Sequence, residues 1–335
     1  MFKWNRVGAL LAAGCMTVAI WAMTAISQAV AIGQPLPGQM GLSEPATEVM
    51  SRISSFHDLV NGIIIVITVF VLLLMIYVMF RFNEKSNPTP SKTTHHVGLE
   101  VAWTVIPIAI LVIIAIPSFK LLNLQYSYPK PDLTIKATGN AWYWDHEYLD
   151  QKGVSITSNM VTDEDILKAE IGDKEYSARF GKLEDGSMEK AKAVYEASKP
   201  IWDKRQAAGQ DTRQLSVDNE IAVPVGKVVH LLVTSNDVIH SWTIPSFGVK
   251  LQAVPGRVSA SWFQPTKVGM FYGQCSVLCG KNHSSMPIAV RVVSEQAYGD
   301  WMAALKAKDP KKAKAILKAE AASQQSSSVA AVQAK

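Results

Sequence analysis

Two long apolar blocks stand near the beginning of the chain. Residues 59–80 are almost uninterruptedly apolar, and residues 101–122 repeat the pattern with Pro107 and Pro117 inside it. At about 1.5 Å of rise per residue, each block is long enough to cross a bilayer core about 30 Å thick. Blocks of this length exceed an ordinary buried helix of a soluble protein. The pattern predicts a hairpin of two transmembrane helices over residues 59–122.

The charges beside these blocks predict their orientation. The connecting loop, residues 81–96, carries three Lys or Arg residues, whereas residues 32–58 carry only Arg52. Positive residues next to membrane helices favour the cytoplasmic side. The loop is therefore expected inside the cell, and both residues 32–58 and the chain after residue 122 are expected outside.

The first 31 residues predict a cleavable secretory signal. A basic start is followed by an apolar run from Val7, which ends in the small residues Ala29-Val30-Ala31. An uncleaved signal anchor is the alternative, because the apolar character persists to the end of this run. A lipoprotein site at Cys15 is disfavoured, since Ala12 stands where a leucine is usual.

Beyond residue 122 the pattern changes to short alternating runs. Leu133, Ile135 and Ala137 fall on one face of a predicted strand. Further β-like runs, separated by Gly and Pro turns, are residues 221–225, 228–235, 258–263, 270–273 and 287–293. Many short strands with this punctuation favour an all-β sandwich or barrel. Residues 123–299 are therefore expected to form an external all-β domain.

Two segments break the β pattern. Residues 151–213 are dense in both signs of charge and are predicted to form a solvated, partly helical insertion. Residues 300–335 are predicted to begin as a helix rich in Lys and Ala and to become a disordered, low-complexity tail from Ser323.

Composition narrows the classes of function. The net charge is +5 over 335 residues, but the basic residues are scattered or gathered near the C-terminus, so no nucleic-acid partner is expected. Three cysteines are too few for a disulfide scaffold. Loss of Cys15 with the signal would leave only Cys275 and Cys279, and this close pair requires its own explanation.

One segment concentrates candidate metal ligands. Residues 275–286, with the sequence CSVLCGKNHSSM, hold two thiols, an imidazole and a thioether. His240 is predicted on a turn after an earlier strand. Soft sulfur ligands favour copper, and a single-copper electron-transfer site combines one Cys, two His and a Met. The extra thiolate would allow a second copper ion to share the site.

Two alternatives account for fewer of these residues. Zinc fits poorly, because the spacing is Cys-x3-Cys and Met is not a usual zinc ligand. A disulfide between Cys275 and Cys279 suits an oxidising compartment but leaves the nearby His and Met residues unexplained. The remaining histidines lack such neighbours and are interpreted as surface or structural residues: His57, His95, His96, His146 and His230.

These motifs resemble subunit II of cytochrome c oxidase in its alphaproteobacterial form. The resemblance covers nearly everything from Gly33 to Val293 except the insertion, and it is carried by residues 139–144, 237–242, 253–257 and 273–288. It implies a two-helix transmembrane hairpin with a cupredoxin-like external domain. The protein would lie in the bacterial inner membrane, in contact with lipid, subunit I and other oxidase subunits, with this domain in the periplasm.

The resemblance also implies a dinuclear copper centre, called CuA, and the residues that hold it. Cys275 and Cys279 would supply the bridging thiolates, and His240 and His283 the two imidazoles. Met286 would supply the thioether, and Val277 a backbone carbonyl.

Further residues receive roles from the resemblance alone. Trp142 would accept the electron from cytochrome c, and Asp237, Glu147 and Tyr143 would face that partner, where carboxylates attract lysines. Tyr143 could equally belong to the core of a strand. Glu100, at the cytoplasmic start of the second span, would feed a proton path, although a carboxylate at this level can also be merely interfacial.

One position departs from the family pattern. The family usually has Cys-Ser-Glu-x-Cys, and Val277 occupies the third position here. The backbone carbonyl remains, but the carboxylate that binds magnesium or manganese at the interface with subunit I is lost. We therefore expect this chain to contribute no side chain to such an ion.

The implied function is electron transfer. The subunit would take electrons singly from cytochrome c and pass them to haem in subunit I, where oxygen is reduced to water and protons are pumped. A quinol oxidase subunit would lack the copper ligands, and a copper-delivery protein would not need Trp142 or Glu100. A copper domain like that of nitrous oxide reductase is disfavoured by the membrane hairpin.

Overall fold

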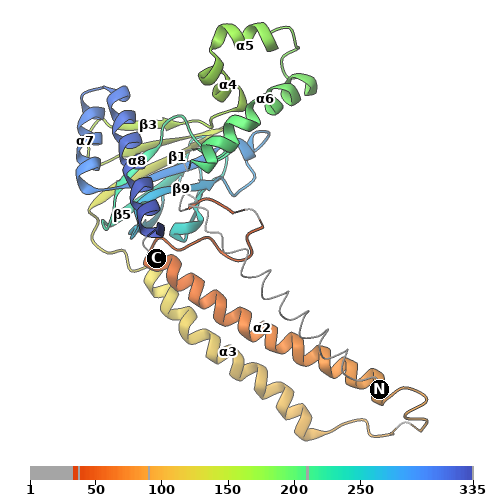
Figure 1. Ribbon diagram of the computed structural model, residues 1–335. Coiled ribbons are helices and arrows are strands. Elements are labelled where there is room, and N and C mark those ends of the chain that lie inside the picture. The colour runs from red at the N-terminus through yellow and green to blue at the C-terminus, as the bar shows by residue number, and fades with distance from the viewer. Residues whose placement is uncertain (1–32, 37, 90, 209–210, 334–335) are drawn as a thin grey trace.

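The computed structural model describes residues 33–36, 38–89, 91–208 and 211–333, with side chains as far as Ser323 (Figure 1). The predicted signal peptide, residues 1–31, lies outside the described residues. Two long helices extend from a β-rich domain, which carries a helical insertion and a pair of C-terminal helices.

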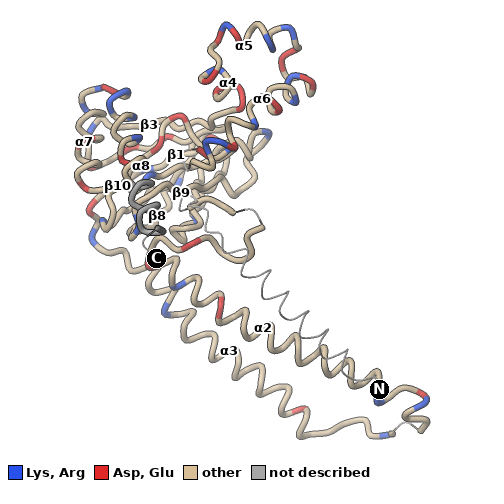
Figure 2. The backbone as a smooth tube through the Cα atoms, in the orientation of Figure 1, with Lys and Arg blue, Asp and Glu red and all other residues tan. Residues whose placement is uncertain are grey.

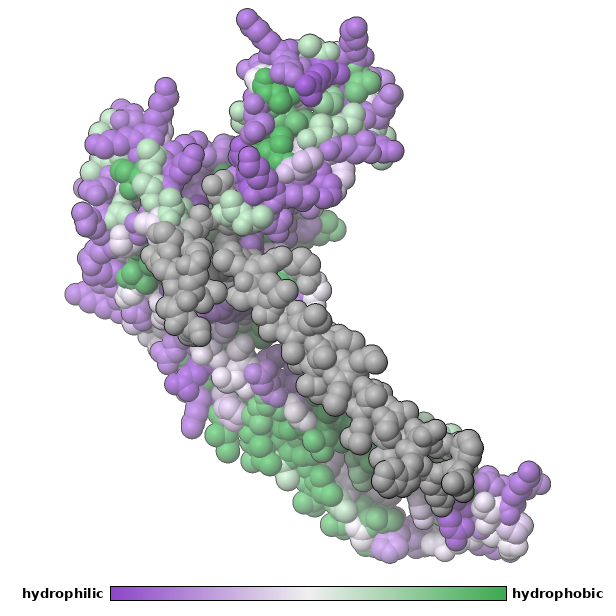
Figure 3. Space-filling model, in the orientation of Figure 1, coloured by the Kyte–Doolittle hydropathy of each residue, from purple (hydrophilic) through white to green (hydrophobic). Residues whose placement is uncertain are grey.

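The long helices are α2 (Glu48–Arg81) and α3 (Val97–Gln125). Both are long and apolar enough to cross a membrane, and their apolar windows are not buried within the chain. The hairpin surface is correspondingly hydrophobic (Figure 3), and charged residues are sparse along it (Figure 2). The predicted hairpin is confirmed, and burial in a soluble core is excluded for these described helices.

Helix α2 begins before the apolar block that predicted it. Thr47 caps the helix, because its side chain accepts a hydrogen bond from the backbone N–H of Met50. The first turn packs on the β domain, where Val49 and Met50 are buried. The first turns of α2 therefore join the hairpin to the external domain, in a segment for which the sequence predicted no helix.

The external domain contains three sheets. Their strand orders are β3-β2-β1-β5-β8, β4-β10-β9 and β6-β7. The strands are β1 (Leu133–Asn140), β2 (Tyr143–Tyr148), β3 (Ser155–Ser158), β4 (Ile221–Pro224), β5 (Val229–Ser235), β6 (His240–Ile244), β7 (Val249–Ala253), β8 (Ser259–Phe263), β9 (Gly269–Gln274) and β10 (Pro287–Val293). Aromatic side chains fill the space between them, and Trp242, Phe247 and Phe271 are fully buried.

The sequence predicted six of these strands and missed β2, β3, β6 and β7. Strand β2 mixes aromatic and charged residues, and only the side chains on one of its faces, such as Trp144 and Tyr148, are buried. Strand β3 lies within the segment assigned to the insertion, although it pairs with β2 and belongs to the sheet. The helical insertion therefore begins after β3, later than residue 151.

The insertion forms a small helical unit of its own. Its helices are α4 (Asp163–Ile171), α5 (Asp173–Phe180) and α6 (Met188–Ala207), and they enclose a cluster of buried apolar residues: Leu167, Tyr176, Phe180 and Val194. Asp163 fastens the base of this unit, because it accepts hydrogen bonds from the Trp202 indole at 2.8 Å and from the Arg213 guanidinium at 2.9 and 2.8 Å. In Figure 1 the unit projects from the sheets.

These contacts predict that acid loosens the insertion. Partial burial alone would raise the pKa of Asp163. Hydrogen bonds from Arg213 and Trp202 nevertheless hold this pKa below its ordinary value. The stabilisation is then complete above about pH 4, the usual value for Asp, and is lost as the pH falls through the lower value of the folded state. Asp163→Asn should reduce hydrogen-exchange protection of α4–α6 at neutral pH and weaken its acid dependence.

The matched control is Asp203→Asn, which removes a carboxylate of the same insertion that pairs with Lys199 while both side chains remain largely exposed. This control should leave the protection factors unchanged, because exposed pairs contribute little. Wild-type protection in the Asp163 variant at neutral pH would contradict the assignment.

Two helices, α7 (Glu295–Lys306) and α8 (Pro310–Gln333), end the described chain. The sequence predicted one helix, and the break falls at Lys308, with a positive φ of 57°, just before Pro310. A disordered tail was predicted from Ser323, whereas the structure continues α8 to Gln333. Ala and Gln, strong helix formers, are frequent in this low-complexity segment.

Candidate metal centre

The candidate ligands come from the loop between β9 and β10 and from the first residue of β6. The antiparallel pairing of β9 with β10 sets Gln274 opposite Pro287, so the two ends of the loop meet. The backbone N–H of Cys275 donates to the carbonyl of Met286 at 3.3 Å. His240 begins β6 and is fully buried, rather than lying on a turn as predicted.

Sulfur atoms lie at the centre of the cluster. The Sγ atoms of Cys275 and Cys279 are 3.8 Å apart. Cys275 Sγ lies 3.9 Å from His240 Nδ1 and 3.3 Å from the carbonyl oxygen of Val277.

The second sulfur completes the group. Cys279 Sγ lies 3.5 Å from His283 Nδ1 and 3.5 Å from Met286 Sδ. The structure thus brings together all six residues that the resemblance singled out as copper ligands. Among the described residues, His240, Cys275 and Cys279 form a group able to hold a metal ion.

The donor set fits copper. Two thiols, two imidazole nitrogens and a thioether are the soft and borderline ligands that copper prefers, and hard cations would not select them. Cys275 and Cys279 are both free, and their separation of 3.8 Å is far beyond the roughly 2 Å of a disulfide. The disulfide alternative therefore does not describe this structure.

Burial also disfavours ionisation of the Cys279 thiol. Burial, together with the charge on the neighbouring Cys275, raises the pKa of the Cys279 thiol to about 12. A protonated thiol is a poor metal ligand, so metal binding here would have to displace protons.

Asp237 positions one of the imidazoles. One of its carboxylate oxygens lies 2.8 Å from Nε2 of His240, and the other accepts from the backbone N–H of Ala141 at 2.6 Å. Partial burial alone would raise the pKa of Asp237. The hydrogen bonds to its carboxylate, of which the bond with His240 has the largest effect, lower this pKa below its ordinary value. A carboxylate that holds Nε2 leaves Nδ1 to face the sulfur atoms, as in many metal sites.

Close approach of the backbone completes this arrangement. A Cβ atom at Gly139 would lie 2.8 Å from Cδ2 of His240, so β1 can run beside the imidazole only with glycine at this position. Across the cluster, the hydroxyl of Ser276 lies 2.8 Å from that of Thr243 and 3.0 Å from that of Ser241, which fastens the ligand loop to β6.

The aromatic run divides into two environments. The indole N–H of Trp142 donates to the carbonyl of Cys279 at 3.2 Å, and its ring lies beside Gly280 while remaining half-buried. Trp144 is fully buried and meets the His240 ring edge-on at 6.0 Å between centroids. Tyr143 is half-buried between them. Trp142 therefore joins the partly exposed surface to the ligand loop, and Trp144 belongs to the core.

Two other candidates lie away from the cluster. Glu147 is exposed towards the other end of β2, where its carboxylate lies 3.8 Å from the Lys136 amine. Glu100 is in the first turn of α3, at the end of the hairpin opposite the external domain, and accepts from the backbone N–H of His96 at 3.3 Å. The Glu100 carboxylate thus caps the N-terminus of α3, the helix to which it belongs.

His146 is a residue whose environment the sequence did not reveal. It is only 1% exposed and its Nε2 accepts from the Trp242 indole at 3.2 Å. Burial lowers the pKa of His146 to about 3, so the ring is neutral at physiological pH. Its alternation with Trp144 along β2 would have suggested an inward-facing side chain if β2 had been recognised.

Comparison with known proteins agrees with the sequence motifs and the geometry. The family described as "Cytochrome C oxidase subunit II, transmembrane domain" matches residues 35–121, and the corresponding periplasmic domain matches residues 133–180 and 193–293. The chain belongs to the cytochrome c oxidase subunit II family. Residues 181–192, between the two matched parts of the periplasmic domain, belong to the insertion.

Individual relatives are similar over most of the chain. The probable cytochrome c oxidase subunit 2 of Rickettsia bellii is 40% identical over 270 residues, which cover 81% of this chain and 85% of the relative. Subunit 2 of Cereibacter sphaeroides is 40% identical over 295 residues, covering 86% and 89%. A crystal structure of the periplasmic domain of subunit II from Bradyrhizobium japonicum is 39% identical, covers 54% of this chain and 97% of that chain, and gives a TM-score of 0.38.

Family membership confirms the resemblance and the predicted fold class. Cytochrome c oxidase subunit II consists of a transmembrane hairpin and an external cupredoxin-like domain, and the structure has both parts. The chain is therefore a membrane-anchored cytochrome c oxidase subunit II, from a copper-binding family, with its C-terminal domain outside the membrane.

Proposed function

We propose that this subunit accepts electrons from cytochrome c at a dinuclear CuA centre and passes them to haem in subunit I. Subunit I would there reduce oxygen to water and pump protons. The observation that carries the proposal is the convergence of two buried thiols with two imidazole Nδ1 atoms, a thioether and a carbonyl, all within 3.9 Å of one sulfur or the other.

The ligand shell is built for retention of the metal. The copper ions would be held by the thiolates of Cys275 and Cys279, the imidazoles of His240 and His283, the thioether of Met286 and the backbone carbonyl of Val277. When bound, the copper pair would supply a one-electron redox couple shared between two ions. Both thiols, His240 and Met286 are buried, which excludes water and disfavours the exchangeable binding expected of a copper-delivery protein.

The surrounding residues divide the remaining tasks. Trp142 would accept the electron, because its indole links the half-buried surface to the carbonyl of a bridging cysteine. Glu147 and Tyr143 would face cytochrome c. Asp237, whose carboxylate already holds His240 and Ala141, would act mainly as a positioning residue. Glu100 would serve proton uptake from the cytoplasm, and the external domain would lie in the periplasm of a bacterial inner membrane.

Paramagnetic resonance of the purified oxidase tests the centre itself. The complex should hold two coppers in this subunit, and its oxidised form should show the hyperfine pattern of a mixed-valence pair. Stopped-flow mixing with reduced cytochrome c should bleach the optical band of that centre before haem is reduced. One copper with the pattern of an isolated ion would refute the dinuclear proposal.

Trp142→Phe tests the route of the electron. The variant should keep its copper and its resonance signal but oxidise cytochrome c at least about tenfold more slowly, the change that an added barrier of about 1.4 kcal/mol produces. Trp262→Phe is the matched control, because its indole also donates to a backbone carbonyl, that of Gln125, at 3.2 Å, but at the junction with α3. Equal rates in the two variants would exclude a special role for Trp142.

Val277→Glu tests the missing carboxylate. The wild-type oxidase should retain no magnesium or manganese through a side chain of this loop, whereas the variant should bind manganese at least about tenfold more tightly, because hard cations prefer carboxylate oxygen. Leu278→Glu is the control, since it adds the same charge one residue away on a side chain that is 80% exposed. Equilibrium dialysis followed by metal analysis measures the difference, and tight binding by the wild type through this subunit would contradict the prediction.

A further inference from the structure

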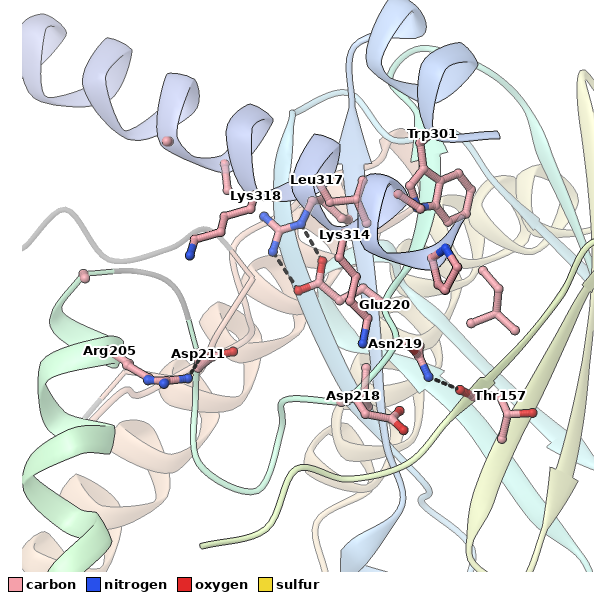
Figure 4. A pocket seen from close by; sticks show the side chains of 18 of the residues that line it. Thr157, Arg205, Asp211, Asp218, Asn219, Glu220, Trp301, Lys314, Leu317 and Lys318 are labelled. Atoms are coloured by element: carbon pink, nitrogen blue, oxygen red, sulfur yellow. Dashed lines mark hydrogen bonds and ion pairs between the residues drawn. The ribbon is translucent and has the colours of Figure 1, made fainter. Parts of the chain in front are cut away.

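A groove with a volume of about 970 Å³ lies between the insertion and the C-terminal helices (Figure 4). Its walls come from α6, from α7 and α8, and from β3 with the segment that leads to β4. None of these elements carries a candidate copper ligand. The volume is that of an ordinary ligand site, and the electron-transfer function described above does not use it.

Aliphatic side chains form much of the groove lining. Ile156, Val217 and Leu317 are nearly buried and line the groove, and Ile201 and Leu305 extend the same surface. The ring of Trp301 also lines it but is only 2% exposed, so it offers little face for stacking. Such a surface suits an acyl chain better than a flat aromatic ring or a base.

The acidic side chains of the groove already have partners. Glu220 is bound by the Arg291 guanidinium at 2.6 and 2.8 Å. Asp211 pairs with Arg205 at 3.1 Å, as Figure 4 shows. Asp218 accepts a hydrogen bond from the backbone N–H of Asn159 at 2.8 Å. These carboxylates are therefore engaged within the protein.

Unlike its acids, the lysines of the groove have no ion-pair partner among the described residues. Lys204 lines the groove from α6. Lys314 and Lys318 line it from successive turns of α8 (Figure 4). Within the part of the chain that the structure describes, no carboxylate lies within ion-pair distance of these three amines. Cationic groups therefore face the groove from two opposing elements above an aliphatic floor.

We propose that this groove binds a single-chain amphipathic anion, with its acyl chain on the aliphatic floor and its carboxylate or phosphate headgroup at the lysines. Charge complementarity selects the anionic head, and the apolar lining selects the chain. An extended peptide fits less well, because Thr157 on the neighbouring edge of β3 already uses its carbonyl to accept from the Asn219 side chain at 2.9 Å. A bound ligand would connect the insertion to the C-terminal helices.

Photo-crosslinking of the intact oxidase in lipid nanodiscs tests this assignment. The probe is a dodecanoate that carries a diazirine on its chain, and the comparison is the corresponding dodecanol with the same diazirine. Mass spectrometry should locate the dodecanoate adducts in α8 and α6, with the alcohol labelling these peptides at least about tenfold less, the loss expected when one charged hydrogen bond is removed. Adducts confined to the membrane helices would overturn the proposal, as would equal labelling by the alcohol.

Matched variants separate a specific site from general attraction to lysine. Lys314→Glu with Lys318→Glu should reduce the labelling at least about tenfold. Lys311→Glu with Lys312→Glu makes the same charge change on exposed positions of the same helix that do not line the groove, and it should leave the labelling intact. An equal loss in both pairs would show that the groove itself is not the site.

Two further arms keep the result decisive. Lys204→Glu changes the opposite wall without touching α8, so it tests the site even if the double variant fails to fold. It should also weaken labelling. Unlabelled dodecanoate and dodecyl phosphate should compete with the probe, and the stronger competitor identifies the headgroup class. Failure of both competitors would refute the site.

Discussion

Serine in place of Cys279 is expected to abolish the two-copper signal of the oxidase. Cys279 Sγ lies within 3.8 Å of three other candidate ligand atoms, Cys275 Sγ, His283 Nδ1 and Met286 Sδ. A serine hydroxyl is a hard, protonated group that copper selects poorly. The affinity for the second copper should fall by more than the roughly 10- to 100-fold that loss of an outer hydrogen-bond partner costs.

Copper analysis and paramagnetic resonance measure this result, and turnover with reduced cytochrome c should fall in parallel. Ser284→Ala is the control, because this exposed residue lies on the same loop between His283 and Met286 and its side chain is not a candidate ligand. Circular dichroism of both variants establishes that the β domain is retained. A mixed-valence pattern in the serine variant would mean that the second thiol does not bridge.

Methionine in place of Arg291 is expected to destabilise the external domain by about 3 kcal/mol, the cost of leaving one member of a buried ion pair without its partner. Arg291 is 6% exposed and binds both carboxylate oxygens of Glu220, at 2.6 and 2.8 Å. The carboxylate left behind would be poorly hydrated, since its side chain is only 21% exposed. Thermal or denaturant unfolding of the purified chain measures the loss.

Two comparisons isolate the buried charge as the cause. Lys267→Met breaks the pair with Glu44, in which both side chains are well exposed, and should cost less than about 1 kcal/mol. Adding Glu220→Gln to the Arg291 variant should recover part of the stability, because the unpaired charge is then removed. If the double variant is no more stable than the single one, packing rather than charge explains the loss.

The membrane hairpin and the ligand loop were accessible to prediction from sequence. Hydrophobicity alone defines the spans, because each block is long and continuous. Five of the six candidate ligands fall between Cys275 and Met286, so their proximity follows from chain connectivity. His240 was a candidate from its place after an earlier strand, but its proximity could not be derived, since it is 35 residues from Cys275 and approaches it through sheet topology.

Contacts between distant segments could not be predicted in this way. Asp163 and Arg213 are 50 residues apart, and neither position carries a pattern that indicates a partner. Strand β2 was missed because Asp145 and Glu147 face outwards between aromatic residues, which weakens the apolar alternation. The groove could not be predicted from the sequence either, because its shape depends on how α6 and α8 lie against the sheets.

The separation of His240 from the thiols also sets an order of biogenesis. The imidazole belongs to β6 and the sulfurs to the loop after β9, so the complete ligand set exists only once these strands have come together. These strands lie in the external domain, beyond the two membrane-spanning helices. For the proposed copper centre, the ligands therefore come together only after the external domain has crossed the membrane and these strands have paired.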